Sequence, residues 1–233
     1  MSFSFRFHAP ELHVLGFRLE DLDLGEAGRI VAESPVMLLG VSILGELKIG
    51  AFSYAGIGGI FGGCTIGRYC SIAPSVRISL GEHPTDWLTT HPLGFGEAHF
   101  GYVEEYAAAQ LFKPRPVEMI RAETIIGNDV WIGANSTLRR GITVGHGAII
   151  GAHSLVLDDV PPYAIVTGAP AKIHRYRFDP DLIQELLALE WWNYDLRIFK
   201  EIDVRDVKGS IEKMKAAIAL HTPKTIEKYI ICA

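Results

Sequence analysis

His83 is the residue of this sequence whose chemistry and position best suit proton transfer. It lies in the stretch RISLGEHPTDWLTTHP, which runs from Arg77 to Pro92. Imidazole exchanges protons near neutral pH, so a positioned histidine can take the proton of an attacking hydroxyl. Aliphatic residues recur at every sixth position up to Ile78, and this regularity then stops and resumes only near Ile126. We therefore expect His83 at a corner where the chain leaves a rigid element and opens a reaction site; an ordinary surface histidine is the alternative.

The element that must position His83 is built from a hexapeptide repeat. In the later part of the chain, residues six apart are all aliphatic, and glycine follows four of the six. The fifth residue of each hexapeptide is small or β-branched. The aliphatic positions are Ile126, Ile132, Leu138, Val144, Ile150 and Val156, and the fifth positions are Val130, Ser136, Ile142, Ala148, Ser154 and Val160.

Earlier parts of the chain carry the same repeat. The aliphatic positions there are Ile60, Ile66, Ile72 and Ile78, with Cys64, Cys70 and Val76 at the fifth positions. A weaker tract holds Ile43 and Ile49, and it is out of step with the tract that follows. We therefore expect a turn or bulge near Ala55–Gly59 that absorbs the slip.

A coil of short strands is the structure that uses a period of six. In a helix, at about 100° per residue, six residues advance about 240° and would scatter the aliphatic side chains around the cylinder. A single long strand is excluded because glycine recurs too often. A coil points the first and fifth side chains of each hexapeptide inward, and coils stacked about 4.8 Å apart then share one core. The sequence therefore predicts a mainly β protein, a parallel β-helix.

The repeat and its interruption divide the chain into three regions. We expect short N-terminal strands in residues 1–34 and the β-helix in residues 35–178, with a loop excursion over residues 84–124. The excursion is rich in aromatic residues and proline, with one helix-prone patch at Glu104–Leu111, and loops of this length are usually functional. A C-terminal helical segment is expected in residues 179–233, with Asp179-Pro180 as a helix start and a further helix from about Ser210 to Leu220.

Composition limits the class of protein and its environment. The 233 residues fit one large domain or a domain with an appendage, and a hydrophobic content of 48% provides a core. A net charge of −5 argues against a nucleic-acid or polybasic membrane surface. The chain has three cysteines and no CxxC pair, so we expect them to be small buried residues rather than a disulfide framework. This favours a reducing compartment. Because no signal peptide or membrane span is recognisable, we expect a cytoplasmic location without membrane insertion.

Two stretches of the repeat resemble a known family of enzymes. The string IIGNDVWIGANSTLRRGITVGHGAIIGAHSLVLDDVPPYAIVTGAPAKIHRYRF resembles the left-handed β-helix of the hexapeptide acyltransferases. The segment IGRYCSIAPSVRIS, followed by a histidine, by Asp-Trp and by Thr-Thr-x-Pro, resembles the xenobiotic acetyltransferase branch, which includes chloramphenicol and streptogramin acetyltransferases. The resemblance spans roughly residues 45–192, including ELLALEWWNYD. It implies a left-handed coil, acetyl-CoA as co-substrate, and a homotrimer with active sites between subunits.

The resemblance also assigns roles to single residues. It places the catalytic base at His83, which would let the acceptor oxygen attack acetyl-CoA directly, without an acyl-enzyme. The main chain of Ala134 and Ala152 would contact the pantetheine arm, and Lys172 and Arg175 would meet the nucleotide end. Independently, KIHRYR is the densest basic cluster in an acidic chain, which suits phosphate binding; a solvated basic corner is the alternative.

Two further positions bear on the substrates. Tyr54 and Trp131 match aromatic residues that line the acceptor pocket in antibiotic-modifying relatives, and packing between subunits is the alternative.

The chain departs from its relatives before the Asp-Val-Pro-Pro segment. Relatives often carry Thr-Lys there, whereas this chain has Leu157 and Asp158, so a contact with CoA made by that lysine is absent.

The histidines give no metal site. The γ-class carbonic anhydrases share the predicted fold and bind zinc through histidines on the coil. Here His8 and His13 precede the coil, and His146 and His153 lie at corners, where we expect them to be exposed. We therefore expect no metal cofactor.

The acceptor is left open by the sequence. Antibiotic-modifying relatives usually carry Ser/Thr-Thr-Tyr-Pro-Phe after the histidine, whereas this chain has Thr89-Thr90-His91-Pro92-Leu93. A polar His91 suits a sugar at least as well as an apolar drug. We expect an acetyl-CoA-dependent O-acetyltransferase that acts on an antibiotic such as chloramphenicol or a streptogramin, or on a similar small molecule. The alternatives are a sugar or polysaccharide O- or N-acetyltransferase and an inactive β-helix scaffold.

Overall fold

The computed structural model describes residues 2–6, 11–25, 28–91, 102–104, 123–200 and 202–232. The chain forms two compact units, one from Met1–Leu80 with Glu123–Ala233 and the other from Gly81–Ala122. Of the expected helix-prone patch at Glu104–Leu111, residues 105–111 lie outside the described residues.

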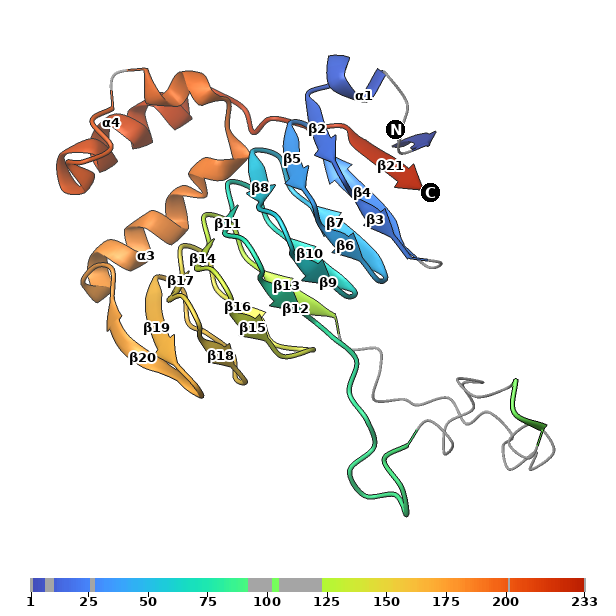
Figure 1. Ribbon diagram of the computed structural model, residues 1–233. Helices are drawn as coiled ribbons and strands as arrows, with labels where there is room; N and C mark the ends of the chain where they lie inside the picture. The colour runs from blue at the N-terminus through green and yellow to red at the C-terminus, as the bar shows by residue number, and fades with distance from the viewer. Residues whose placement is uncertain are drawn as a thin grey trace. The chain divides into compact units, whose positions relative to one another are not determined.

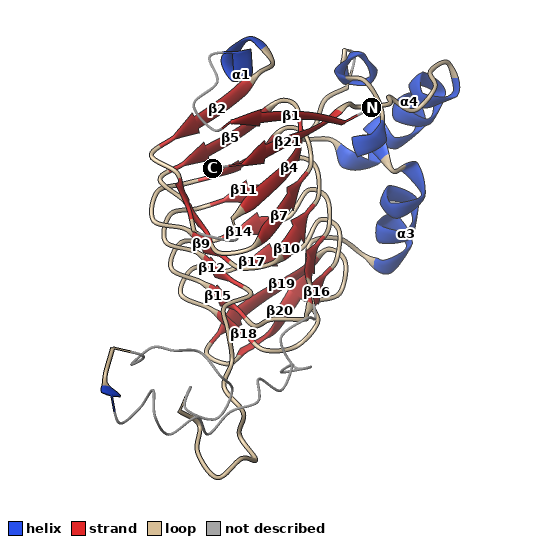
Figure 2. Cartoon of the chain, turned by 90° about the vertical axis from the view of Figure 1, so that its right-hand side faces the viewer, coloured by secondary structure: helices blue, strands red, loops and turns tan. Residues whose placement is uncertain are grey.

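The first unit contains three sheets (Figures 1 and 2). Sheet A contains, in spatial order, β1 (Ser2–Arg6), β21 (Lys228–Cys232), β4 (Arg29–Glu33), β7 (Glu46–Ile49), β10 (Cys64–Ile66), β13 (Thr124–Ile126) and β16 (Thr143–Val144). Sheet B contains β2 (Phe17–Glu20), β5 (Val36–Leu39), β8 (Ser53–Ala55), β11 (Ser71–Ile72), β14 (Trp131–Ile132), β17 (Ile149–Ile150), β19 (Ala164–Gly168) and β20 (Ala171–Tyr176). Sheet C contains β18 (Leu155–Val156), β15 (Thr137–Leu138), β12 (Arg77–Ile78), β9 (Ile60–Phe61), β6 (Ser42–Ile43) and β3 (Asp23–Leu24).

The chain visits the three sheets in turn, which confirms the predicted β-helix. From β2 to β15, each strand pairs in parallel with the strand one coil later, as in the register of Ile132 with Ile150 and of Leu138 with Val156. The aliphatic positions of the later repeat are all at most 2% exposed, so they form the inward core. Figure 1 shows the coils stacked in sequence order from β2 to β18. The fold is the expected mainly β helix of hexapeptide repeats with α-helices near the C-terminus.

The register of the early coils differs from the sequence prediction. Phe61 is fully buried, whereas Ile60 is only partly buried, so the inward position of β9 is Phe61. Inward positions therefore run in steps of six from Ile43 through Ala55 to Phe61, and the slip lies at the Gly62–Gly63 corner rather than near Ala55–Gly59. A side chain at residue 62 would overlap the main-chain oxygen of Ser79, which is why glycine stands at this tight corner.

Helices pack beside the coil in the C-terminal part of the chain (Figure 2). As predicted, α3 (Pro180–Leu189) begins after Asp179, whose side chain accepts a hydrogen bond from the N–H of Leu182 at 3.0 Å. The described residues also include the helices α1 (Glu11–Val14) and α4 (Val207–Ala219) and the 3₁₀ turns η3 (Trp191–Asn193) and η4 (Leu196–Phe199). None of the helices in the described ranges is long and apolar enough to cross a membrane.

The last strand was not predicted. β21 lies between β1 and β4, parallel to the first and antiparallel to the second. Both ends of the chain therefore meet on sheet A, as Figure 1 shows. Strand β21 covers the main-chain edge that β4 would otherwise present at the first coils.

Candidate active site

A row of exposed and partly buried side chains crosses the outer face of sheet B. Successive parallel and antiparallel pairs bring Tyr54, Ser71, Trp131, Ile149, Ile165 and Arg175 into one register. Within this row, Trp131 is 53% exposed and Tyr54 is 42% exposed. Alternation along a strand explains the exposure, because Ile132 and Ala55, one residue further on, point into the core. Large aromatic side chains held outward on a rigid sheet provide a contact surface for a substrate or another subunit.

The corner that follows sheet B stacks Ala134 on Ala152. The N–H of His153 donates to the main-chain oxygen of Ala134 at 2.8 Å, which joins the two corners. A Cβ on Gly133 would lie 2.5 Å from the main-chain nitrogen of Ala152, so the close stacking depends on glycine. Among the described residues, neither the N–H of Ala134 nor that of Ala152 has an acceptor. Ala152 is exposed, so this corner can offer main-chain donors to an extended ligand.

The basic pair lies on the hairpin that extends sheet B. β20 runs antiparallel to β19, with Lys172 opposite Thr167 and Arg175 opposite Ile165. Lys172 and Arg175 are exposed, and Arg175 donates to the main-chain oxygen of Tyr176 at 3.1 Å. Because Gly151 packs on Thr167, the Lys172 end of the hairpin adjoins the corner that carries Ala152. The two cations can therefore meet phosphate groups next to the main-chain donors.

His83 belongs to the second unit, just after β12 in the chain. Its Nδ1 lies 2.6 Å from the main-chain oxygen of Thr90. A carbonyl oxygen only accepts, so Nδ1 donates the proton, and Nε2 is the basic nitrogen of the neutral ring. The ring is exposed. A tautomer fixed in this way suits a general base, because the second nitrogen takes up the substrate proton.

Six of the seven predicted site residues thus share sheet B and its adjoining corner in the first unit. They are Tyr54, Trp131, Ala134, Ala152, Lys172 and Arg175. His83 is described within the unit Gly81–Ala122.

His146 differs from its predicted exposure. Its ring stacks on Trp192 with centroids 4.7 Å apart, and its Nδ1 accepts from the N–H of Asn128 at 2.8 Å. Burial lowers the pKa of His146, which keeps the ring neutral. His153, in contrast, is exposed at its corner as predicted. The partial burial of His146 could not be predicted from the sequence, because its stacking partner, Trp192, is distant in the chain.

The two buried cysteines of the coil are not reactive thiols. Burial raises the pKa of Cys64 and of Cys70 to about 12, so neither thiol ionises near neutral pH. Within the described ranges, no three His, Cys, Asp or Glu side chains are grouped to hold a metal ion.

The repeat defines the class of protein. Residues 123–158 match the family model described as "Bacterial transferase hexapeptide (six repeats)". This segment covers the coils from β13 to β18, which carry Trp131, Ala134 and Ala152. Fold and repeat therefore define a hexapeptide-repeat transferase.

The relatives narrow this class to a family. The chain is 36% identical over 152 residues to a probable macrolide acetyltransferase of Lysinibacillus sphaericus, covering 64% of this chain and 80% of that protein. It is 38% identical over 161 residues to a chloramphenicol acetyltransferase of Agrobacterium fabrum, covering 67% of this chain and 65% of that protein. A solved structure of a hexapeptide-repeat acetyltransferase from Vibrio cholerae, complexed with acetyl coenzyme A, is 24% identical with a TM-score of 0.39, covering 64% of this chain and 72% of that one. The chain belongs to the hexapeptide-repeat acyltransferases, in the xenobiotic acetyltransferase branch, and acetyl-CoA is the co-substrate of this class of enzyme.

Proposed function

We propose that this enzyme transfers the acetyl group of acetyl-CoA directly to a hydroxyl group of a small acceptor, with His83 as the general base. Nε2 of His83 takes the hydroxyl proton while the acceptor oxygen bonds to the thioester carbonyl carbon. The carbon–sulfur bond then breaks, and the CoA sulfur leaves and receives the proton that His83 took from the acceptor. The observation that supports this role most directly is the contact between Nδ1 of His83 and the oxygen of Thr90, because it fixes the tautomer that a base needs.

The corner of Ala134 and Ala152 supports a binding place for the pantetheine arm. An extended amide chain pairs well with main-chain donors on a flat β-surface, and neither N–H group has an acceptor among the described residues. Lys172 and Arg175 would neutralise the phosphates at the nucleotide end. The developing oxyanion would be stabilised by main-chain N–H groups near Gly133–Ala134.

A homotrimer with the site between subunits is part of this proposal. The exposed aromatic side chains of Tyr54 and Trp131, in register with Ile149 and Ile165, present an apolar face that a second subunit and the acceptor would share. The reaction is placed in the cytoplasm, where acetyl-CoA is available and the free cysteines stay reduced.

An apolar antibiotic is the acceptor class that we favour. The curated relatives are named for chloramphenicol, macrolide and virginiamycin A acetylation, and these acceptors carry hydroxyl groups on bulky, partly apolar frameworks. Outward-facing Tyr54 and Trp131 can pack against such frameworks. The second candidate is a sugar or polysaccharide, which an exposed, polar His91 favours.

A CoA-release assay tests the proposal. Wild type should release CoA with chloramphenicol, a streptogramin A or a macrolide faster than with nucleotide sugars. His83→Ala should lower the rate by about 10²–10⁴-fold, the usual loss for a general base. His13→Ala, which removes an exposed imidazole on α1, is the matched control and should keep full activity. An unchanged rate in His83→Ala would contradict the role of His83, and no turnover with any acceptor would favour an inactive scaffold.

A further inference from the structure

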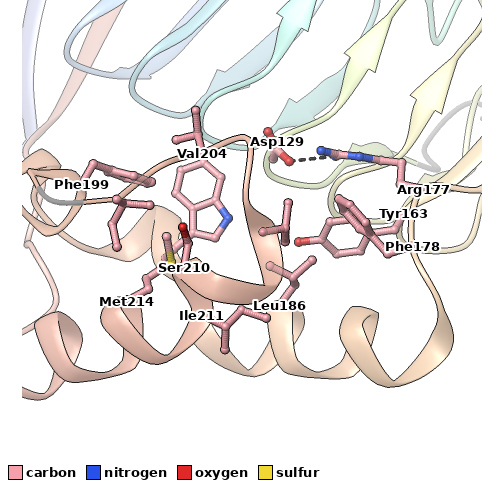
Figure 3. A pocket seen from close by; sticks show the side chains of 13 residues that line it. Asp129, Tyr163, Arg177, Phe178, Leu186, Phe199, Val204, Ser210, Ile211 and Met214 are labelled. Carbon is pink, nitrogen blue, oxygen red and sulfur yellow. Dashed lines mark hydrogen bonds and ion pairs between the residues drawn. The ribbon is translucent and has the colours of Figure 1, made fainter.

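A cavity of about 270 Å³ lies between a corner of the β-helix and the C-terminal helices (Figure 3). Apolar side chains from α3, α4 and the segment between them supply most of its walls, including Leu186, Phe199, Ile211 and Met214. Val204, which is 69% exposed, marks the mouth of the cavity. Cavities of about 150 Å³ with apolar walls bind benzene, so this one has room for a substituted ring.

The hydroxyl of Tyr163 is the polar atom that makes this cavity unusual. Tyr163 is only 1% exposed, and its hydroxyl has no hydrogen-bond partner among the described residues. Figure 3 shows the hydroxyl pointing toward the apolar side chains of the lining. Burial, together with the nearby Asp129, raises the pKa of Tyr163 to about 12, so the phenol keeps its proton and can donate it. A buried hydroxyl without a partner is costly, and a ligand that supplies the partner removes this cost.

The charged groups of the lining compensate each other. Nη1 of Arg177 donates to Oδ2 of Asp129 at 3.0 Å and to the main-chain oxygen of Gly147 at 2.8 Å. The guanidinium also lies over the rings of Tyr163 and Phe178, at 5.2 and 5.3 Å from their centroids. Because the two opposite charges are paired, the cavity favours a neutral ligand over an ion.

The cavity is separate from the corner proposed for CoA. Asp129 precedes β14, whereas Ala134 follows it, so the two lie at opposite ends of that strand. In the same way, Tyr163 precedes β19, and Lys172 pairs with Thr167 near the other end of that strand. Binding in the cavity can therefore be tested independently of acetyl transfer.

We propose that this cavity is a binding site for a small, neutral, mainly apolar molecule that carries one hydrogen-bonding atom. The apolar walls hold the body of the ligand, and the Tyr163 hydroxyl pairs with its polar atom. Neither the CoA-binding corner nor the residues of the acetyl-transfer step take part in this second site.

Methyl NMR with three matched probes tests the proposal. In full-length protein labelled with [¹³C-methyl]methionine, Met214 reports on the cavity and Met37, on β5, serves as the reference. p-Cresol should shift the Met214 signal saturably and leave the Met37 signal unchanged. p-Xylene, which lacks the hydroxyl, should bind roughly three- to tenfold more weakly, the effect of one hydrogen bond. p-Toluate, which is anionic, should also bind more weakly, because burying a charge without a counter-ion is costly.

Variants separate recognition from simple trapping in an apolar space. Tyr163→Phe should fold, because the hydroxyl has no partner to lose, and should weaken p-cresol binding to the level of p-xylene. Val204→Trp should block the mouth, whereas Leu220→Trp, at a position that is 83% exposed beyond α4, should not change binding. The proposal is overturned if p-cresol gives no saturable shift of Met214, if p-xylene or p-toluate binds as tightly, or if Tyr163→Phe binds p-cresol as wild type does.

Discussion

Replacing Glu33 by Gln tests the ion pair that ties the early coils to the C-terminal segment. Arg68 donates to both carboxylate oxygens of Glu33, at 2.6 and 2.9 Å. Its Nη1 also donates to the main-chain oxygen of Trp192 at 3.3 Å and to Oδ1 of Asn193 at 3.1 Å. Glu33→Gln keeps the shape of the side chain but leaves the charge of Arg68 without its counter-ion.

The expected loss follows from the burial of the pair. The side chains of Arg68 and Glu33 are only 16% and 12% exposed. Removing one partner of a buried pair costs about 3–5 kcal/mol, and the remaining exposure places this variant near the lower end, at about 3 kcal/mol. For a chain of this size, that corresponds to a fall in Tm of about 6–12 °C.

Calorimetry and urea unfolding measure this loss against a matched control. Glu46→Gln removes an exposed carboxylate that lies 3.5 Å from Arg29, and should cost less than about 1 kcal/mol. The double variant Glu33→Gln/Arg68→Met should lose less unfolding free energy than the two single variants together, because no unpaired charge remains in it. The reasoning is refuted if Glu33→Gln lowers Tm no more than Glu46→Gln.

The same pair predicts a pH dependence. Burial alone would raise the pKa of Glu33, but the hydrogen bonds from Arg68 and from the N–H of Ala51 lower it below its ordinary value of 4.5. A carboxyl whose folded pKa is lowered stabilises the protein above its ordinary pKa, and this contribution is lost as the pH falls through the folded pKa. The stability difference between wild type and Glu33→Gln should therefore be full at pH 7 and shrink below pH 4.5.

Three further outcomes are expected. Gly133→Ala should cost about 1–3 kcal/mol in unfolding free energy, because its Cβ would lie 2.5 Å from a main-chain nitrogen of the next coil. Gly63→Ala is the control and should cost much less, because its Cβ meets nothing within 4 Å. Equal losses in the two variants would contradict the stacking argument. Because the folded pKa of His146 is lowered, urea unfolding should show stability falling as the pH drops through 6.5, and His146→Asn should lose this dependence. Lys172→Gln with Arg175→Gln should raise KM for acetyl-CoA several-fold with little change in kcat, and an unchanged KM would remove these cations from the CoA site.

The sequence predicted the coil because its signal is local and repeated. Every later hexapeptide places an aliphatic residue inward, so a single rule accounts for Ile126, Ile132 and Leu138 alike. The same rule failed at β9, where Ile60 fits the aliphatic pattern but the aromatic Phe61 fills the core. A corner that is one residue shorter, at Gly62–Gly63, changes the register without any change in the period on either side.

Other features of the structure depend on contacts between residues far apart in the sequence, which a repeat pattern does not reveal. β21 joins sheet A from the far end of the chain, and Arg68 meets Asn193 across 125 residues. Arg177 belongs to the basic segment that was assigned to CoA, yet it faces Asp129 in the cavity beside the helices. Only the three-dimensional packing separates it from its exposed neighbours Lys172 and Arg175.

A crystal structure of the enzyme soaked with CoA and an acceptor tests the central claim most directly. The account predicts that the CoA sulfur lies next to Nε2 of His83, with the pantetheine arm against the main chain of Ala134 and Ala152. It also predicts that the acceptor hydroxyl lies within hydrogen-bond reach of the same nitrogen. A CoA molecule bound away from this corner, or a His83 ring remote from both substrates, would contradict it.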